Sequence, residues 1–483
     1  MPAAGRSASP AVTNRRPHAA TEKSEESASP SDAKDAEQGA NWSSAMGAGS
    51  IVPLVLVVTS PLLCNFMAFI SMSPELSEPT LSAFTTYCTN LGWTDALTNV
   101  LYTFCLPSNV EAWTFFGVFM LLAAFLCLMP GSTRYGPATA TGHVPKYTDN
   151  GLLHCFLFSA VFFGCSNLGA GLYDVGVIYD VFPPLIGALN ITGLLFCLFL
   201  YVKGLSFPST KDCGSSGSIV IDYYWGTELY PRFLGLDVKR LVNCRFSMTF
   251  WMLAGLSFTY RSFTIHGSVD YGLLLSAVSQ YLYLVKFFAW EIGYMRSIDI
   301  IVDRAGFYET WGCLVWVPSL YTLHTRVLVR APSHLSLEVS VALFVLSLVG
   351  VFLNFWADKQ REWFREANGE MNIFGRKAEF VRAEYSVVEN GKLVKKTSLL
   401  LASGFWGVAR HFHYLFELTA AWSWGLLGNP LINGAVPLFY PIFLTILLFD
   451  RARRDEEKCL KKYGEDYKKY AALVRYYIIP GIY

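Results

Sequence analysis

The residues best suited to chemistry lie in the stretch LLASGFWGVARHFHY, residues 400–414, where one arginine and two histidines interrupt an apolar run. An ionisable side chain at the centre of a membrane helix costs about 2.5 to 3.5 kcal/mol, so by default it marks a functional site. Trp406, Arg410 and Tyr414 are spaced at i, i+4 and i+8, which would place them on one face of a helix. We expect this face to line a polar pocket. The simpler alternative is an arginine that reaches to the membrane interface.

The elements that must position these residues are membrane helices. The chain has 483 residues, of which 53% are hydrophobic and 16% aromatic, and its net charge is +1. Apolar runs of about 20 residues, enough to cross a bilayer core, recur between residues 51 and 450. The near-neutral charge gives no support to nucleic-acid binding. No CxxC pair occurs among the cysteines, so neither a metal site nor a disulfide framework is expected.

We therefore predict an all-α, polytopic integral membrane protein with about ten transmembrane helices. Residues 1–48 are rich in Ser, Ala, Glu and Lys and are predicted to form a disordered tail, followed by one transmembrane domain over 49–483. The predicted spans are 51–70, 113–130, 152–172, 182–204, 246–264, 271–290, 308–329, 336–356, 398–426 and 434–450.

Basic residues gather in two segments, 358–397 and the tail after 450, that flank the last predicted pair of spans. Because two spans separate them, both segments fall on the same side, which the positive-inside rule assigns to the cytosol. A polyanion with a planar ring could enter at this basic mouth, and NADPH fits that description. No GxGxxG follows a strand, so a helical pocket would have to hold the dinucleotide in place of a Rossmann domain.

The tail continues the pattern. RARRDEEKCLKKYGEDYKKY, residues 451–470, predicts a polar helix interrupted at Gly464. Asp455, Cys459 and Lys462 fall on one side of it, with Tyr463 beside them. The alternative is a solvated, salt-bridged surface helix. Its position directly after a span and beside the polar stretch favours a role in the pocket.

Several long motifs together resemble the sterol C=C reductases, a family that includes the delta-14 and delta-7 sterol reductases, the fungal delta-24(28) reductase and the lamin B receptor. The resemblance covers about residues 222–483, and Tyr308–Trp316 with the ending PGIY is most similar to the delta-7 branch. The motifs are GFWGVARHFHY, RDEEKCLKKYGEDYKKY, YYIIPGIY, DYYWGTELYPRFLGLDVKRLVNCRFSMTFW and WEIGYMRSIDIIVDRAGFYETWGCLVWVPSLYTL.

The resemblance implies a multi-pass protein of the endoplasmic reticulum membrane that reduces the C7–C8 double bond of a sterol 5,7-diene with NADPH. The pocket for cofactor and sterol would be formed by about residues 290–483. The implied partners are the sterol substrate, membrane lipid and other membrane enzymes of the sterol pathway. The implied cofactor contacts are Arg361, Arg365, Leu401, Trp406, His413, Tyr414, Asp455, Cys459, Lys462, Tyr463 and Tyr470.

Reduction by alkene protonation and hydride transfer needs an acid in a dry site. The candidate catalytic residues are Asp455, Tyr321 and Tyr414, while Asp299 and Asp303, one helical turn apart, would orient the donor or hold a water. Each has a structural alternative, a packing or interfacial ring for the tyrosines and an ion pair for the aspartates.

Two positions depart from the family pattern: Cys313 stands where relatives usually have Asp, and Phe355 where Arg is expected. These changes point to altered specificity or lost activity. Outside the pocket, Lys286 is expected to reach to the membrane interface and Glu291 to pair with an arginine. A delta-14 reductase and a non-catalytic sterol-binding membrane scaffold remain the alternative functions. A transporter would need repeated halves, which the sequence does not contain.

Overall fold

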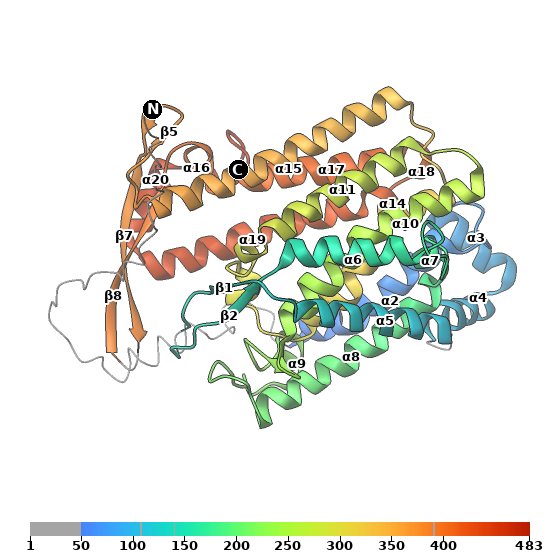
Figure 1. The fold of residues 1–483 in the computed structure, drawn as a ribbon, viewed down its shortest axis with the longest axis horizontal. Coiled ribbons are helices and arrows are strands. Elements are labelled where there is room, and N and C mark those ends of the chain that lie inside the picture. Colours follow the sequence, from blue (N-terminus) through green and yellow to red (C-terminus); the bar gives the residue numbers. More distant parts are fainter. Residues whose placement is uncertain (1–49, 107–108, 140, 390–391) are drawn as a thin grey trace, which may run out of the picture.

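A computed structural model describes residues 50–106, 109–139, 141–389 and 392–483, so the predicted tail 1–48 lies outside the described residues. Helices dominate these ranges, as predicted, and run roughly along the long axis of the molecule (Figure 1). The α-helices are α2 Ile51–Met72, α3 Leu81–Leu91, α4 Trp93–Val100, α5 Val110–Cys127, α6 Gly151–Cys165, α7 Val177–Asp180, α8 Phe182–Ser206, α9 Ile219–Trp225, α10 Met248–His266, α11 Tyr271–Ala289, α12 Glu291–Tyr294, α13 Ile298–Ile301, α14 Leu323–Arg326, α15 Leu337–Glu366, α16 Phe405–Val408, α17 Phe412–Leu427, α18 Pro430–Asn433, α19 Phe439–Tyr463 and α20 Glu465–Leu473. The π-helical segments are η2 Leu101–Cys105, η3 Arg240–Ser247 and η4 Phe307–Tyr321, and the short 3₁₀ turns are η5 Val327–Val329 and η6 Val436–Leu438.

Strands form a minor part that the all-α prediction missed. In the part of the chain that the structure describes there are four antiparallel two-stranded sheets, each made by consecutive strands. The strands are β1 Ser132–Tyr135, β2 Lys146–Asp149, β3 Arg232–Phe233, β4 Leu236–Asp237, β5 Asn372–Ile373, β6 Arg376–Lys377, β7 Phe380–Glu389 and β8 Lys392–Leu401.

Five helical segments among the described residues are long and apolar enough to cross a membrane, so the predicted number of about ten is not confirmed. The second of them runs across residues 107–108, which lie outside the described ranges. Other predicted spans are present as helices that are shorter or more polar, such as α6 and α10. The five segments are Ile51–Met72, Trp93–Cys127, Phe182–Ser206, Tyr271–Ala289 and Leu337–Glu366.

The predicted span 308–329 is a π-helix, η4, followed by α14 and η5. Pro318 lies inside η4 and has no N–H to donate, and π-helical turns occur often at functional sites. η4 packs against α8 where Gly193 leaves room for an indole, since a Cβ atom there would lie 2.9 Å from Cδ1 of Trp311. Trp311 Nε1 also donates to Asn190 Oδ1 of α8 at 3.1 Å. These contacts fix η4 beside the cavity described below.

α15 and α17 form a closely packed helix pair near the C-terminal end of the fold (Figure 1). A Cβ atom at Gly350 would lie 2.8 Å from the main-chain oxygen of Phe416 and 3.0 Å from the nitrogen of Ala420. Only a residue without a side chain permits this approach, as at many helix contacts in membranes. The pair brings the ends of both helices to the predicted site.

The prediction of one helix over 398–426 is wrong. Residues 398–401 end β8, whose Leu401 pairs with Phe380 of β7, and the helix α17 begins only at Phe412. Gly404 adopts φ +62, which ends the strand, and Ala409 forms a parallel bridge to Tyr476. Trp406, Arg410 and Tyr414 therefore lie in a short helix, a turn and the start of a second helix, not on one helix face.

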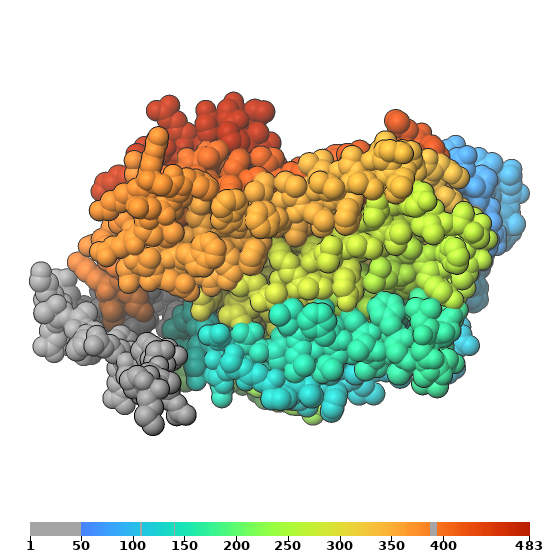
Figure 2. All heavy atoms as spheres, turned by 45° about the horizontal axis from the view of Figure 1, so that its top comes forward, coloured from blue at the N-terminus to red at the C-terminus, as the bar shows by residue number. Residues whose placement is uncertain are grey.

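The predicted break in the tail helix is confirmed. α19 continues from the membrane region to Tyr463, Gly464 adopts φ +52, and α20 follows. In the space-filling view, the region of β7 and β8, in orange, and most of the C-terminal segment, in red, lie at the same end of the molecule (Figure 2). That end contains the predicted cofactor residues.

Candidate active site

A cavity of about 980 Å³ extends from the end formed by β8, α16 and α20 into the helices. Its walls come from α2, η3, α10, α11, η4, α15, β8, α17 and α19. All predicted cofactor and catalytic residues line it: Tyr321, Arg361, Arg365, Leu401, Trp406, His413, Tyr414, Asp455, Cys459, Lys462, Tyr463 and Tyr470. Residues from distant parts of the sequence therefore meet around one space, as expected of a single site.

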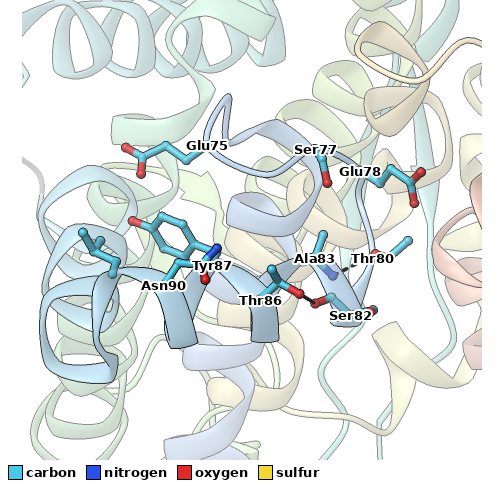
Figure 3. Close-up of a pocket in the computed structure, with 10 residues that line it drawn as sticks. Glu75, Ser77, Glu78, Thr80, Ser82, Ala83, Thr86, Tyr87 and Asn90 are labelled. Atoms are coloured by element: carbon cyan, nitrogen blue, oxygen red, sulfur yellow. Dashed lines mark hydrogen bonds between the residues drawn. The ribbon is translucent and has the colours of Figure 1, made fainter.

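A separate hollow of about 630 Å³ lies on α3 and the loop before it. Its close-up shows Glu75 and Glu78 with the polar face of α3, including Tyr87 (Figure 3). None of the predicted site residues lines it. The residues that line it are not among those that line the large cavity, so this hollow is separate from the site.

Four cations define the mouth of the large cavity: Arg361 and Arg365 at the end of α15, and Lys458 and Lys462 on α19. Arg361 Nη2 donates to Asp358 at 3.2 Å, and its guanidinium lies 3.9 Å from the ring centre of Trp406. Arg365 is exposed, and its side chain makes no hydrogen bond or ion pair with a described residue. The mouth therefore offers positive charge that the protein does not neutralise.

Lys458 and Cys459 are both affected by burial at this mouth. Burial lowers the pKa of Lys458 below its usual 10.5, while the nearby Asp455 carboxylate opposes that shift. Burial, and then Asp455, raise the pKa of Cys459 to about 12, and its Sγ lies 3.9 Å from Asp455 Oδ2. Cys459 is thus a neutral thiol that packs in the wall, with no nucleophilic role.

An aromatic slot, Trp406, His413 and Tyr414, lies beside the cationic mouth. Trp406 Nε1 donates to Ala357 O at 2.8 Å, which fixes the indole against α15. The His413 ring centre lies 4.8 Å from Trp406 and 4.3 Å from Tyr414, and Tyr414 also stacks on His411. Rings held in this way can receive a planar ring by stacking.

The deep part of the cavity is apolar and aromatic. The Tyr321 ring centre lies 4.7 Å from Tyr440 and 5.2 Å from Trp251, and Trp251 Nε1 donates to Gln280 at 2.7 Å. Further lining residues at this end are Leu56, Trp316, Val317, Phe443, Leu444, Leu447 and Leu448. A cavity with these walls suits a rigid hydrocarbon ligand.

Arg410, the residue that first marked the stretch, holds the chain together. Its Nη1 donates to the main-chain oxygens of Val474 at 2.5 Å and Arg475 at 3.2 Å. Its Nε lies 3.1 Å from Glu456 Oε2, and its guanidinium lies over the Tyr477 ring at 4.1 Å. Although Arg410 borders the cavity, its donors serve the contact between the turn before α17 and the C-terminal segment.

The acidic residues expected beside the donor are in ion pairs. Asp299 of α13 lines the cavity and pairs with Arg451, and Asp303 pairs with Arg454 at 3.5 Å. Glu291 pairs with an arginine as predicted, since its carboxylate lies 2.7 Å from Arg245 Nη2. These carboxylates therefore take part in ion pairs, which was the alternative considered for the two aspartates.

The position of Lys286 differs from the expectation, and the two departures from the family pattern, Cys313 and Phe355, differ in whether they border the cavity. Lys286 does not reach to the membrane interface, because it lines the cavity and donates to Asn354 Oδ1 at 2.9 Å. Cys313 also lines the cavity, where its sulfur accepts from Asn243 Nδ2 at 3.0 Å. Phe355 lies outside the cavity wall and packs edge-to-face on Trp290. Of the two departures from the family pattern, only Cys313 therefore borders the site.

Sequence reasoning missed several lining residues, all within motifs it had quoted. Asn243 of η3, Tyr294 of α12 and Glu309 of η4 border the cavity with Cys313. The motifs indicated their importance without indicating which side chains face the cavity. η3 and η4 are π-helices, so a 3.6-residue period could not identify those positions.

Comparison with known proteins decides the family. Residues 45–483 match the ergosterol biosynthesis ERG4/ERG24 family. The chain belongs to this family. It is therefore related to sterol reductases, which are membrane-embedded oxidoreductases of sterol biosynthesis, and the resemblance noted in the sequence is confirmed.

Individual relatives carry two different names. The chain is 41% identical to an Arabidopsis thaliana protein named 7-dehydrocholesterol reductase over 357 residues, 74% of this chain and 81% of the relative. It is 33% identical to a Danio rerio protein of the same name over 443 residues, 89% of this chain and 90% of the relative. It is 34% identical to a Methylotuvimicrobium alcaliphilum protein named delta(14)-sterol reductase over 368 residues, 76% of this chain and 81% of the relative. The family is thus established at the level of sterol reduction.

Proposed function

We propose that this family member is an NADPH-dependent delta-7 sterol reductase, which reduces the C7–C8 double bond of a sterol 5,7-diene. The observation that carries the proposal is the 41% identity over most of both chains to a protein named 7-dehydrocholesterol reductase. The multi-pass form and the family favour a site in the endoplasmic reticulum membrane, with association with other membrane enzymes of the sterol pathway.

The residues at the cavity mouth fit NADPH. The Arg365 side chain makes no hydrogen bond or ion pair with any described residue, and Lys458 and Lys462 lie on the facing helix, so cations are available for phosphate groups. The aromatic slot of Trp406, His413 and Tyr414 would hold the nicotinamide. When bound, the cofactor supplies the hydride. The further contacts that we assign to it are Arg361, Leu401, Asp455, Cys459, Tyr463 and Tyr470.

The apolar part of the cavity would bind the sterol. Trp251, Tyr321 and Tyr440 offer flat aromatic walls, so a sterol ring held against them is shielded from water. The aromatic slot adjoins the cationic mouth, where the Arg361 guanidinium lies 3.9 Å from the Trp406 ring centre, and both line the same cavity as the apolar part. This arrangement suits transfer of hydride from a cofactor at the mouth to a double bond held in the apolar part.

Three residues predicted as proton donors border the cavity at different depths. Tyr414 stacks on His411, and Asp455 lies 3.7 Å from His411 Nε2 at the mouth. Tyr321 lies among aromatic rings farther in. A tyrosine can also act by orienting the sterol, so activity measurements on Tyr321→Phe and Tyr414→Phe are needed to assign their roles.

The test is a diene assay with the purified full-length chain. Incubation with NADPH and 7-dehydrocholesterol is expected to remove the ultraviolet absorbance of the conjugated diene, and sterol analysis should identify the C7–C8 reduced product. A delta-8,14 diene is supplied in parallel, because other relatives are named delta(14)-sterol reductase. Reduction of that substrate alone would replace the delta-7 proposal by the delta-14 alternative. Binding of sterol and NADPH without turnover of either diene would favour the non-catalytic scaffold.

A further inference from the structure

We infer that the side-chain carboxyl group of Glu309 is the proton donor to the sterol double bond. The inference rests on the proposed function and adds the acid that this reaction needs. Glu309 lies on η4 in the wall of the cavity, together with Asn243, Tyr294 and Cys313. None of the residues assigned to the cofactor contacts it through a hydrogen bond or ion pair.

Glu309 is buried, with 5% of its surface exposed, yet it borders the cavity. Thr310 Oγ1 donates to its Oε2 at 3.0 Å. Its Oε1 has only the weak contact with the Cys313 thiol, at 3.8 Å. One carboxyl oxygen is thus held by the protein, while the other remains available to carry a proton towards the cavity.

No basic side chain among the described residues forms an ion pair with Glu309. The charge of Lys239 acts on Glu309, but the Lys239 ammonium group has three N–H donors. These donors meet three main-chain oxygens, those of Ile300 at 2.6 Å, Asp303 at 2.7 Å and Asp299 at 3.3 Å. Because a buried carboxylate without an ion pair is costly, the uncharged acid is the favoured form of Glu309.

The other carboxyl groups on the cavity wall are placed differently. Glu366 is exposed, and Glu417 is occupied as an acceptor of the Tyr283 hydroxyl at 2.7 Å. The remaining four each face a basic side chain: Asp299 with Arg451, Asp358 with Arg361, Glu362 with Lys359 and Asp455 with His411. Among the described residues, Glu309 alone combines burial, a place on the cavity wall and the absence of a bonded polar or basic partner other than Thr310 and Cys313.

The proposed step balances as follows. The π electrons of the sterol double bond take the proton of Glu309, so its O–H bond breaks, a C–H bond forms, and a carboxylate and a carbocation remain. NADPH, the cofactor of the proposed function, would supply when bound the hydride that neutralises the carbocation, and would itself be oxidised to NADP⁺. A proton from water restores the acid. A positioned acid of this kind contributes typically about 10² to 10⁴-fold to a rate.

The experiment compares the purified full-length chain with Glu309→Gln, which keeps the size of the side chain and an acceptor for Thr310. We expect kcat for the diene to fall by about 100-fold or more, while NADPH affinity and thermal stability stay near those of the wild type. In infrared spectra, the C=O band of a protonated carboxyl group should be present in the wild type and lost in the variant. This readout does not depend on turnover. Glu338→Gln, an exposed position at the start of α15, is the matched control and should behave as the wild type.

Other outcomes would overturn the inference. Turnover by Glu309→Gln within about threefold of the wild type would exclude a proton donor, since a general acid contributes more than that. Glu417→Gln is tested in parallel, and a loss of turnover there with normal Glu309→Gln would move the acid to α17. Loss of NADPH binding and stability in Glu309→Gln would give Glu309 a structural role. If the wild type reduces neither diene, the proposed function itself fails, and the donor fails with it.

Discussion

Replacement of Arg365 by alanine tests the cofactor assignment most directly. Arg365 is exposed at the cavity mouth and its side chain makes no hydrogen bond or ion pair with any described residue, so removing the side chain breaks no such bond. A hydrogen bond to a charged group contributes about 1.5 to 3 kcal/mol, and solvent at an exposed site favours the lower value. If Arg365 binds the 2'-phosphate, the dissociation constant for NADPH should rise about tenfold, which corresponds to about 1.4 kcal/mol. NADH lacks this phosphate, so its affinity should stay unchanged.

The assay is a titration of each dinucleotide into the purified protein, followed by fluorescence. Arg453→Ala is the matched control, because Arg453 is also an exposed arginine, pairs with Asp450 and Glu457, and lies outside the cavity wall. It should bind both dinucleotides as the wild type does. Equal losses of NADPH and NADH affinity in Arg365→Ala would refute the reasoning, because they would place the effect on the fold of the mouth and not on the 2'-phosphate.

Three further predictions concern the framework of the site. Arg410→Ala removes the ion-pair partner of the Glu456 carboxylate, which retains the Tyr467 hydroxyl as a donor, and should lower stability by about 3 kcal/mol, measured by thermal unfolding; an unchanged Tm would contradict its structural role. Gly350→Leu should cost about 1 to 3 kcal/mol by forcing α15 away from α17, whereas Gly117→Leu, with open space around its Cβ position, should have little effect on Tm. Burial lowers the pKa of Lys458, so this lysine loses its charge at a pH lower than the usual 10.5. NADPH affinity should therefore decrease as the pH rises, and the decrease should begin below pH 10.5. Lys458→Arg keeps the charge and should move that fall to higher pH; an identical profile would exclude Lys458 as its cause.

The part of the site that could be predicted lies on regular helices. Asp455, Cys459 and Lys462 were expected on one side of the tail helix, and all three line the cavity because α19 runs without interruption to Tyr463. The break at Gly464 was also predictable, since glycine readily adopts the positive φ found there.

The part that could not be predicted depends on contacts between distant residues. Arg410 was placed on a helix face with Trp406 and Tyr414, but main-chain bonds to Tyr476 hold the stretch in a turn. Local hydrophobicity carries no information about such a partner. The strands β7 and β8 were likewise not predicted. The end of β8, Leu399–Leu401, is apolar and was interpreted as the start of a membrane span, whereas in the structure it pairs with β7.

Glu309 illustrates a different reason. Its neighbours in η4 follow the wider turn of a π-helix, in which the usual i, i+3, i+4 relations no longer identify a common face. Its significance also depends on the lack of an ion pair with any basic side chain of the described ranges, which can be recognised only once the donors of Lys239 are accounted for.

The contact between Arg410 and residues 474–476 has a consequence for biosynthesis. The ribosome makes these residues after every described helix that is long and apolar enough to cross the bilayer has been translated. Membrane insertion can therefore be complete before the contact of Arg410 with residues 474–476 has formed at the mouth of the cavity. At that stage the apolar interior of the cavity is accessible from the mouth. A chain that stops before Val474 would be integrated into the membrane without a finished cofactor site, and quality control would meet it as an inserted but inactive protein.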